Sequence, residues 1–258
     1  MSFRGAPHEA FDARVIGDLD TVGAALVLDH LRVLVETVAY VVLLAAVGRR
    51  LTRRWALKGV RAGERLGYQV ALGAGVVALA MLVLALAQQL GVIQIAAVLA
   101  LAILWARREV AAAAATILRA GRGVVSTLPP GWPRGVGGTL AVCFAVIVVS
   151  RALMPPVDWD TQMYHLPLPL HFLAEGGFAV PEGNTMLSSA GLPHLLVLPL
   201  LVFAGPTGMQ LLNTALLFVL IAFVGAVGWR FGRRPFEAES HAGGAKKREG
   251  PGPEEERH

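Results

Sequence analysis

The sequence predicts an all-α, polytopic integral membrane protein with about six transmembrane helices and one external loop that carries short surface helices. Of its 258 residues, 55% are hydrophobic and only 16% are charged, whereas a soluble domain has about a quarter charged residues. The charges are segregated, since none occurs from Leu66 to Ala106 or from Gly183 to Trp229. Each uncharged run is about twice as long as the ~20 residues that cross a bilayer, so each is expected to fold back once.

The first membrane region, residues 22–126, follows a polar segment at 1–21 and is expected to hold three helices. Its first candidate span, 22–48, contains Asp29, His30, Arg32 and Glu36 at spacings of three and four, which allows local ion pairing in the membrane. The alternative is a helix that lies at the interface and enters the membrane only with its C-terminal half.

The next two spans form a predicted hairpin, at 67–88 and 92–106. Between them, Gln88-Gln89-Leu90-Gly91 places a polar pair and a glycine between apolar halves. The Ala-rich stretch 110–118 is expected to extend the second of these helices into the cytoplasm.

A Pro- and Gly-rich cytoplasmic linker at 127–135 leads to the second membrane region, 136–230. Its spans are predicted at 136–154, 187–204 and 209–229, with a turn at Gly205-Pro206-Thr207-Gly208 between the last two. The external loop, 155–192, is expected to carry a surface helix at 168–174 that stops at Gly176-Gly177. The last residues, 231–258, are rich in Gly, Pro and charges and are predicted to be a disordered tail.

Charge placement predicts the orientation. Basic residues crowd the segments 49–66 and 107–135, whereas 155–192 has no Lys or Arg, so the first two are predicted to be cytoplasmic and the third external. Strict alternation then puts the tail outside, although it begins with Arg230, Arg233 and Arg234. Either the proline-containing span at 187–204 is re-entrant, or the tail violates the rule. Because the +5 net charge lies in these short segments, it does not indicate a nucleic-acid partner.

The external loop opens with the chemically richest segment, Pro155-Pro156-Val157-Asp158-Trp159-Asp160-Thr161-Gln162-Met163-Tyr164-His165-Leu166. A fixed carboxylate such as Asp160, or Asp158, can take the proton that an alcohol loses when its oxygen attacks carbon. The two carboxylates could instead hold a divalent cation or be solvated loop residues. Trp159 and Tyr164 are also typical interfacial anchors. His165 and His171 have no third ligand at metal spacing, so no zinc site is predicted.

With its residues in this order, the segment resembles part of a known protein family. A membrane-exit helix, a Pro-Pro-x-x-Trp-Asp-x-x-x-Tyr-His-Leu loop and a Gly-Gly stop are similar to the first external loop of polytopic glycosyltransferases of the GT-C superfamily. The later run Asn184, Ser188, Ser189 and Leu192-Pro193-His194, which leads into a proline-containing span, is similar to the segment after that loop in those enzymes. The likeness covers about 136–230, the N-terminal part only of longer proteins, so we expect a truncated or C-terminally divergent relative.

The resemblance implies a chain in the cytoplasmic (inner) membrane that transfers sugar from a polyprenyl-phosphate donor to an external acceptor. It implies that Asp160 is the general base or positions the acceptor hydroxyl, with Asp158 as second candidate. Trp159, Tyr164 and His165 would bind sugar or donor phosphate. The alternative is a non-catalytic membrane subunit that uses the loop to bind a protein or lipid partner. A transporter fragment fits less well, because the later spans contain no Asp, Glu, Lys or Arg.

Overall fold

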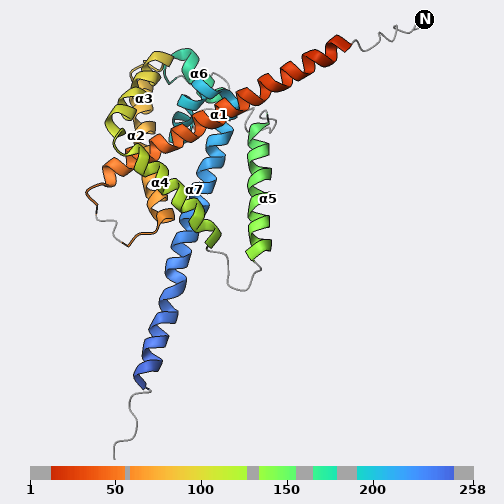
Figure 1. Cartoon of the computed structure of the whole chain (residues 1–258). Helices are drawn as coiled ribbons and strands as arrows, with labels where there is room; N and C mark the ends of the chain where they lie inside the picture. Colours follow the sequence, from red (N-terminus) through yellow and green to blue (C-terminus); the bar gives the residue numbers. More distant parts are fainter. Residues whose placement is uncertain (1–12, 56–58, 127–133, 155–164, 179–190, 247–258) are drawn as a thin grey trace, which may run out of the picture.

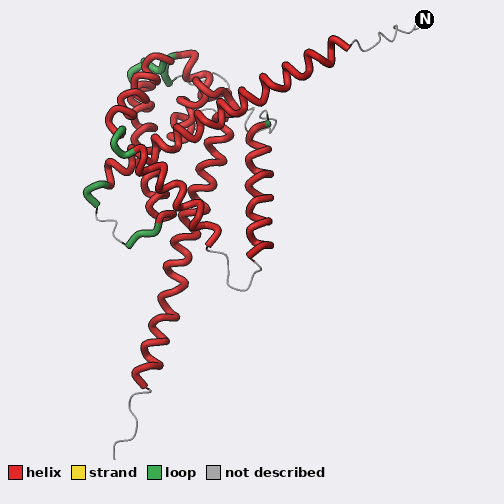
Figure 2. Tube along the Cα trace, in the orientation of Figure 1, coloured by secondary structure: helices red, strands yellow, loops and turns green. Residues whose placement is uncertain are grey.

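The computed structural model describes residues 13–55, 59–126, 134–154, 165–178 and 191–246, and all regular structure in these ranges is helical (Figures 1 and 2). An all-α fold is therefore confirmed. The helices, in chain order, are α1 (Ala13–Thr52), α2 (Ala62–Leu86), α3 (Val92–Ala106), α4 (Val110–Ser126), α5 (Arg134–Leu153), α6 (Pro167–Glu175) and α7 (Leu192–Lys246).

In the described part of the chain, four helical segments are long and apolar enough to cross a membrane: Ala24–Thr52, Ala62–Leu86, Gly135–Leu153 and Leu192–Phe231. Helix α3 has 15 residues, which makes it about 22 Å long, less than the ~30 Å of a hydrocarbon core. The membrane-protein class is thus supported, but the predicted six spans are not confirmed.

Helices α1 and α2 form a tightly packed antiparallel pair at the centre of the bundle. A Cβ on Gly48 of α1 would lie against the backbone oxygen of Gln69 in α2, and a Cβ on Gly73 would lie against the backbone oxygen of Leu44. Ala45, between these contacts, is fully buried. Small residues of this kind let two helix backbones approach closely, which is how helices pack in a membrane without a hydrophobic driving force.

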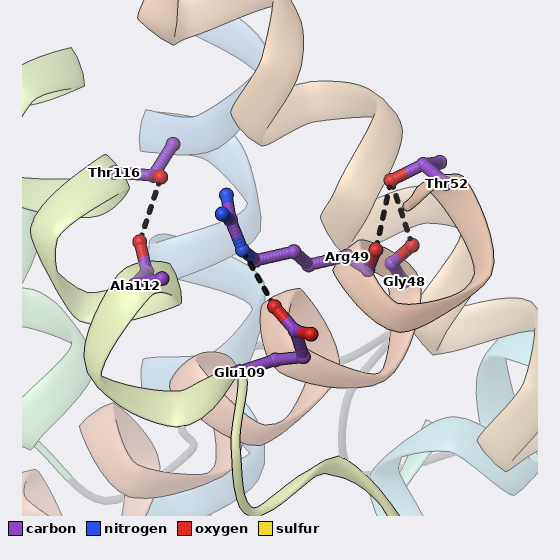
Figure 3. A network of polar contacts seen from close by, with 6 residues as sticks. All are labelled: Gly48, Arg49, Thr52, Glu109, Ala112 and Thr116. Atoms are coloured by element: carbon purple, nitrogen blue, oxygen red, sulfur yellow. Dashed lines mark hydrogen bonds and ion pairs between the residues drawn. The ribbon is translucent and has the colours of Figure 1, made fainter. Parts of the chain in front are cut away.

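One end of the bundle, which we call the basic end, gathers the C-terminus of α1, the α3–α4 junction and the start of α2. Arg49 Nε donates to Glu109 Oε2 at 2.8 Å (Figure 3), and the Arg50 guanidinium lies 5.1 Å from the centre of the Trp105 ring. Near Arg49, Thr52 Oγ1 donates to the Gly48 carbonyl at 3.0 Å (Figure 3). The two predicted basic loops therefore meet at one end of the molecule.

The opposite end, which we call the loop end, gathers the α2–α3 turn, α6 and the start of α7. The Leu90 amide donates to the Gly176 carbonyl at 2.6 Å. Phe172 of α6 and Leu195 of α7 are buried with Leu90 and Ile95 in one apolar cluster. The predicted helix break at 88–91, a helix that covers 168–174 and its end at Gly176 are all present in the structure.

Helix α7 consists of two helices folded sharply at Gly205. This residue has φ 67° and ψ −167°, a backbone conformation that glycine adopts without steric cost. Residues eight apart in a continuous helix are separated by about 12 Å, yet a Cβ on Gly208 would lie 3.4 Å from the Leu200 oxygen. The predicted turn at 205–208 is thus present, and the part before it, Leu192 to Ala204, is short.

The second part of α7 runs from the loop end to the basic end, antiparallel to α2. With its side-chain nitrogen facing α5, Gln210 donates to the carbonyls of Ala152 at 3.1 Å and Met154 at 2.7 Å. At the other end, Arg230 Nη1 lies 3.3 Å from Glu64 Oε2. Arg230, where the tail begins, therefore lies at the same end of the bundle as the two basic segments.

Two further segments differ from expectation. Residues 107–109 form a turn, and α4 is a separate helix that packs on α1, α2 and α7 rather than an extension of α3. Beyond residue 231, where disorder is predicted, α7 continues as helix to Lys246. This stretch includes Glu237, Ala238 and Glu239, which favour helix by intrinsic propensity.

Removal of Arg230 is expected to destabilise the contact between α2 and α7. Glu64 is only 2% exposed and its Oε1 has no hydrogen-bond partner in the described residues, so Arg230→Ala leaves a buried carboxylate without its ion pair. We expect a loss of about 1–3 kcal/mol in the free energy of unfolding, measured by thermal unfolding in detergent. The double variant Glu64→Leu/Arg230→Leu is expected to recover most of the lost stability, because an apolar pair leaves no buried charge. A double variant as unstable as Arg230→Ala would contradict this account.

Candidate functional site

Two histidines from different helices meet at the loop end. His165 Nδ1 lies 3.2 Å from His194 Nε2, and the rings stack with centroids 5.4 Å apart and planes 19° apart. His165 precedes α6 directly, and His194 lies in the first turn of α7, where its amide donates to the Gly191 carbonyl at 3.0 Å. The packing of α6 on α7 thus brings together residues that are 29 positions apart in the chain.

The two ring nitrogens in contact have different roles: when one proton lies between them, one nitrogen donates the hydrogen bond and the other accepts it. His194 Nδ1 is buried and has no hydrogen-bond partner in the described residues. His165 is exposed, so it is the member of the pair that a ligand can reach. An imidazole placed this way can bind an oxyanion or exchange a proton with it.

Only one predicted site residue, His165, lies in the described part of the chain. Asp158, Trp159, Asp160 and Tyr164 fall in residues 155–164, outside the described residues. The described segments on either side of them end at Met154 and begin again at His165. Both flanks belong to the loop end, since the Met154 carbonyl accepts from Gln210 and His165 contacts His194.

A hollow of about 280 Å³ with both apolar and polar lining residues adjoins the end of α5. Its polar lining comes from Arg151 of α5 and from Gln210, Asn213 and Thr214 of α7. Arg151 makes no ion pair with a carboxylate in the described residues. An exposed arginine beside neutral hydrogen-bonding groups suits an anionic ligand such as a phosphate.

The described residues hold no group of three or more His, Cys, Asp or Glu side chains that could bind a metal ion. His171, the other loop histidine, lies on α6 with a buried Nε2 that has no hydrogen-bond partner in these ranges. The carboxylates of the divalent-cation alternative, Asp158 and Asp160, lie outside the described residues, so that alternative stays a prediction.

Sequence reasoning missed His194 and Arg151 as candidate site residues. His194 stands out in the sequence only as part of the second run of the family resemblance. Arg151 is a single basic residue close to the predicted external loop, where the positive-inside rule expects few basic residues. Their position is a usable signal, because each is a polar residue near the end of an apolar helix next to the predicted external loop. No local sequence pattern shows that the packing of α5, α6 and α7 brings these termini to the same end of the bundle.

Comparison with protein-family models, with curated proteins and with solved structures found no match to this chain.

Proposed function

We propose that this chain is a membrane glycosyltransferase, or the N-terminal part of one, that transfers sugar from a polyprenyl-phosphate donor to an acceptor on the external side of the cytoplasmic membrane. The observation that supports it best is the His165–His194 contact at 3.2 Å. Each histidine belongs to one of the two sequence runs that resemble the GT-C superfamily. In that proposal the runs form a single site, with Asp160 as base and Trp159, Tyr164 and His165 as ligand contacts.

Arg151, beside the hollow, supplies the positive charge that binding of such a donor requires. A polyprenyl-phosphate sugar presents an anionic phosphate at the membrane surface, and arginine binds phosphate oxygens through its planar set of donors. Arg151 lies one turn from the end of α5, next to Met154, after which the acidic segment begins. Phosphate at Arg151 and acceptor hydroxyl at Asp160 would then lie on the same side of the membrane.

The proposed orientation places the basic end in the cytoplasm and the loop end outside. Helices α1, α2, α3, α5 and the second part of α7 connect the two ends, while Leu192–Ala204 is a re-entrant segment that stays towards the loop end. Arg230 then emerges on the cytoplasmic side, next to Glu64. This arrangement removes the conflict with the positive-inside rule that six full spans create.

A non-catalytic subunit is the second candidate, and the exposure of α5 favours it. Val136, Leu140, Val142, Val146 and Ile147 of α5 are all more than half exposed. An apolar helix face of this kind can contact lipid or a helix of another membrane protein. In that case the loop end would bind a partner rather than transfer sugar.

The test is sugar transfer by the chain in membrane vesicles. Vesicles with the inserted protein, supplied with polyprenyl phosphate that carries a radiolabelled sugar, are expected to transfer label to endogenous acceptor. Vesicles from cells without the chain provide the background. Background-level transfer by a protein that is inserted and folded would overturn the enzyme proposal and favour the subunit.

A further inference from the structure

An apolar groove of about 510 Å³ runs between α1, α3 and the first part of α7. Its volume is in the range of small-molecule sites. Carbon atoms dominate its lining, which includes Leu43 of α1, Leu99, Ile103 and Val110 from α3 and the start of α4, and Pro199 and Phe203 of α7. The Tyr40 hydroxyl, also at the groove, is already used, since it donates to the Leu196 carbonyl at 2.9 Å. An occupant therefore gains dispersion contacts along most of the groove but few hydrogen bonds.

The two ends of the groove differ in charge. Towards the basic end it reaches Ile103 and Val110, and between these positions the chain carries Trp105, Arg107 and Arg108. The Arg50 guanidinium stacks 5.1 Å from the centre of the Trp105 ring. The nearest carboxylate along the chain, Glu109, is already held by Arg49 at 2.8 Å. At its other end the groove reaches Glu36, which lies 3.9 Å from Arg32. Arg32 also contacts Asp29, so two carboxylates share one guanidinium and the net negative charge disfavours an anion there.

We propose that this groove binds one anionic phospholipid, with an acyl chain along the apolar walls and the phosphodiester headgroup at Arg50, Trp105 and Arg107. Positive charge at one end and a carboxylate at the other fix which way round the lipid lies. Arginines near the membrane surface attract anionic headgroups, and a tryptophan at this depth is amphipathic like the headgroup region itself. The inference requires that the chain lies in a membrane but does not depend on sugar transfer.

The site is tested by native mass spectrometry of the purified protein with added phosphatidylglycerol or phosphatidylcholine of identical chains. We expect phosphatidylglycerol to bind at least several-fold more tightly than phosphatidylcholine. The double variant Arg50→Gln/Arg107→Gln is expected to weaken the binding of phosphatidylglycerol about tenfold or more, because it removes the attraction of two arginines for an anionic headgroup. The matched control, Arg119→Gln/Arg122→Gln, removes the same charge from exposed positions of α4 that do not line the groove and is expected to leave binding nearly unchanged.

A second variant tests the groove itself. Ile103 is 52% exposed, so Ile103→Trp fits without disturbing buried packing and fills the acyl-chain path. It is expected to reduce phosphatidylglycerol binding although every arginine remains. Soluble glycerol phosphate is expected not to compete, because it lacks the chain; effective competition would indicate a phosphate site instead. If the α4 control loses as much phosphatidylglycerol binding as the groove variant, or if both lipids bind equally well, the proposal is wrong. The first result would show that the lipid is held by general electrostatic attraction to the protein surface.

Discussion

Gly73→Ala is expected to force α1 and α2 apart and cost about 3 kcal/mol or more, at the upper end of overpacking penalties. The added Cβ would collide with the backbone oxygen of Leu44. A flexible side chain could rotate away, but a helix backbone moves only with the whole helix. The α1–α2 contact is the most extensive between any two helices in the described residues, so the displacement spreads through the core. Thermal unfolding and size-exclusion chromatography in mild detergent measure the effect.

The chain supplies a matched control two residues away. A Cβ on Gly75, in the same helix, would meet nothing within 4 Å. Gly75→Ala is therefore expected to be neutral or to stabilise α2 by about 0.5–1 kcal/mol, the helix-propensity difference. Gly48→Ala, which meets the Gln69 backbone from the other helix, should behave like Gly73→Ala. Similar stability of the Gly73 and Gly75 variants would show that the helices do not approach this closely.

Asp160→Asn is expected to lower sugar transfer about 10²–10⁴-fold, the usual contribution of general acid–base catalysis. Asparagine keeps the shape and hydrogen-bonding capacity of the side chain but cannot accept the acceptor's proton. The measurement is the initial rate of label transfer in vesicles with equal amounts of inserted protein. Because Asp160 lies outside the described residues, the prediction rests on the family resemblance and on the chemistry of proton transfer.

Asp158→Asn is the matched control, since it removes the same charge two residues away. If Asp160 is the base, the Asp158 variant keeps most of the activity. If both variants lose activity equally and added divalent cation partly restores that activity, the two carboxylates instead share a metal site. Full activity of Asp160→Asn would contradict the assigned role of this residue.

The helix breaks at 88–91, 176 and 205 were predictable because their causes are local, whereas the break at 107–109 was not predicted. Gln88 to Gly91 places polar groups and a glycine between apolar runs, and α2 ends at Leu86 while α3 begins at Val92. Gly205 adopts a positive φ next to a proline, and Gly176 ends α6. Each of these positions follows from the backbone preferences of one or two residues.

The path of the chain between breaks was not predictable from the same information. Hydropathy shows that Leu192–Ala204 is apolar but not whether it connects the two ends of the bundle. That depends on the fold at Gly205 and on contacts such as Gln210 with α5 and Arg230 with Glu64. The pairing of His165 with His194 likewise results from helix packing. The acidic segment was identified by residue type and order alone, and its geometry lies outside the described residues.

The fold at Gly205 also changes the chemical character of an otherwise uncharged run. Where a helix ends, up to four main-chain carbonyls lose their intrahelical partners. In a re-entrant segment these oxygens would lie below the membrane surface and would act as neutral acceptors whose strength does not vary with pH. The chain would thus offer a hydroxyl-rich molecule, such as a sugar, a set of fixed dipoles at a depth where a buried charge would be costly.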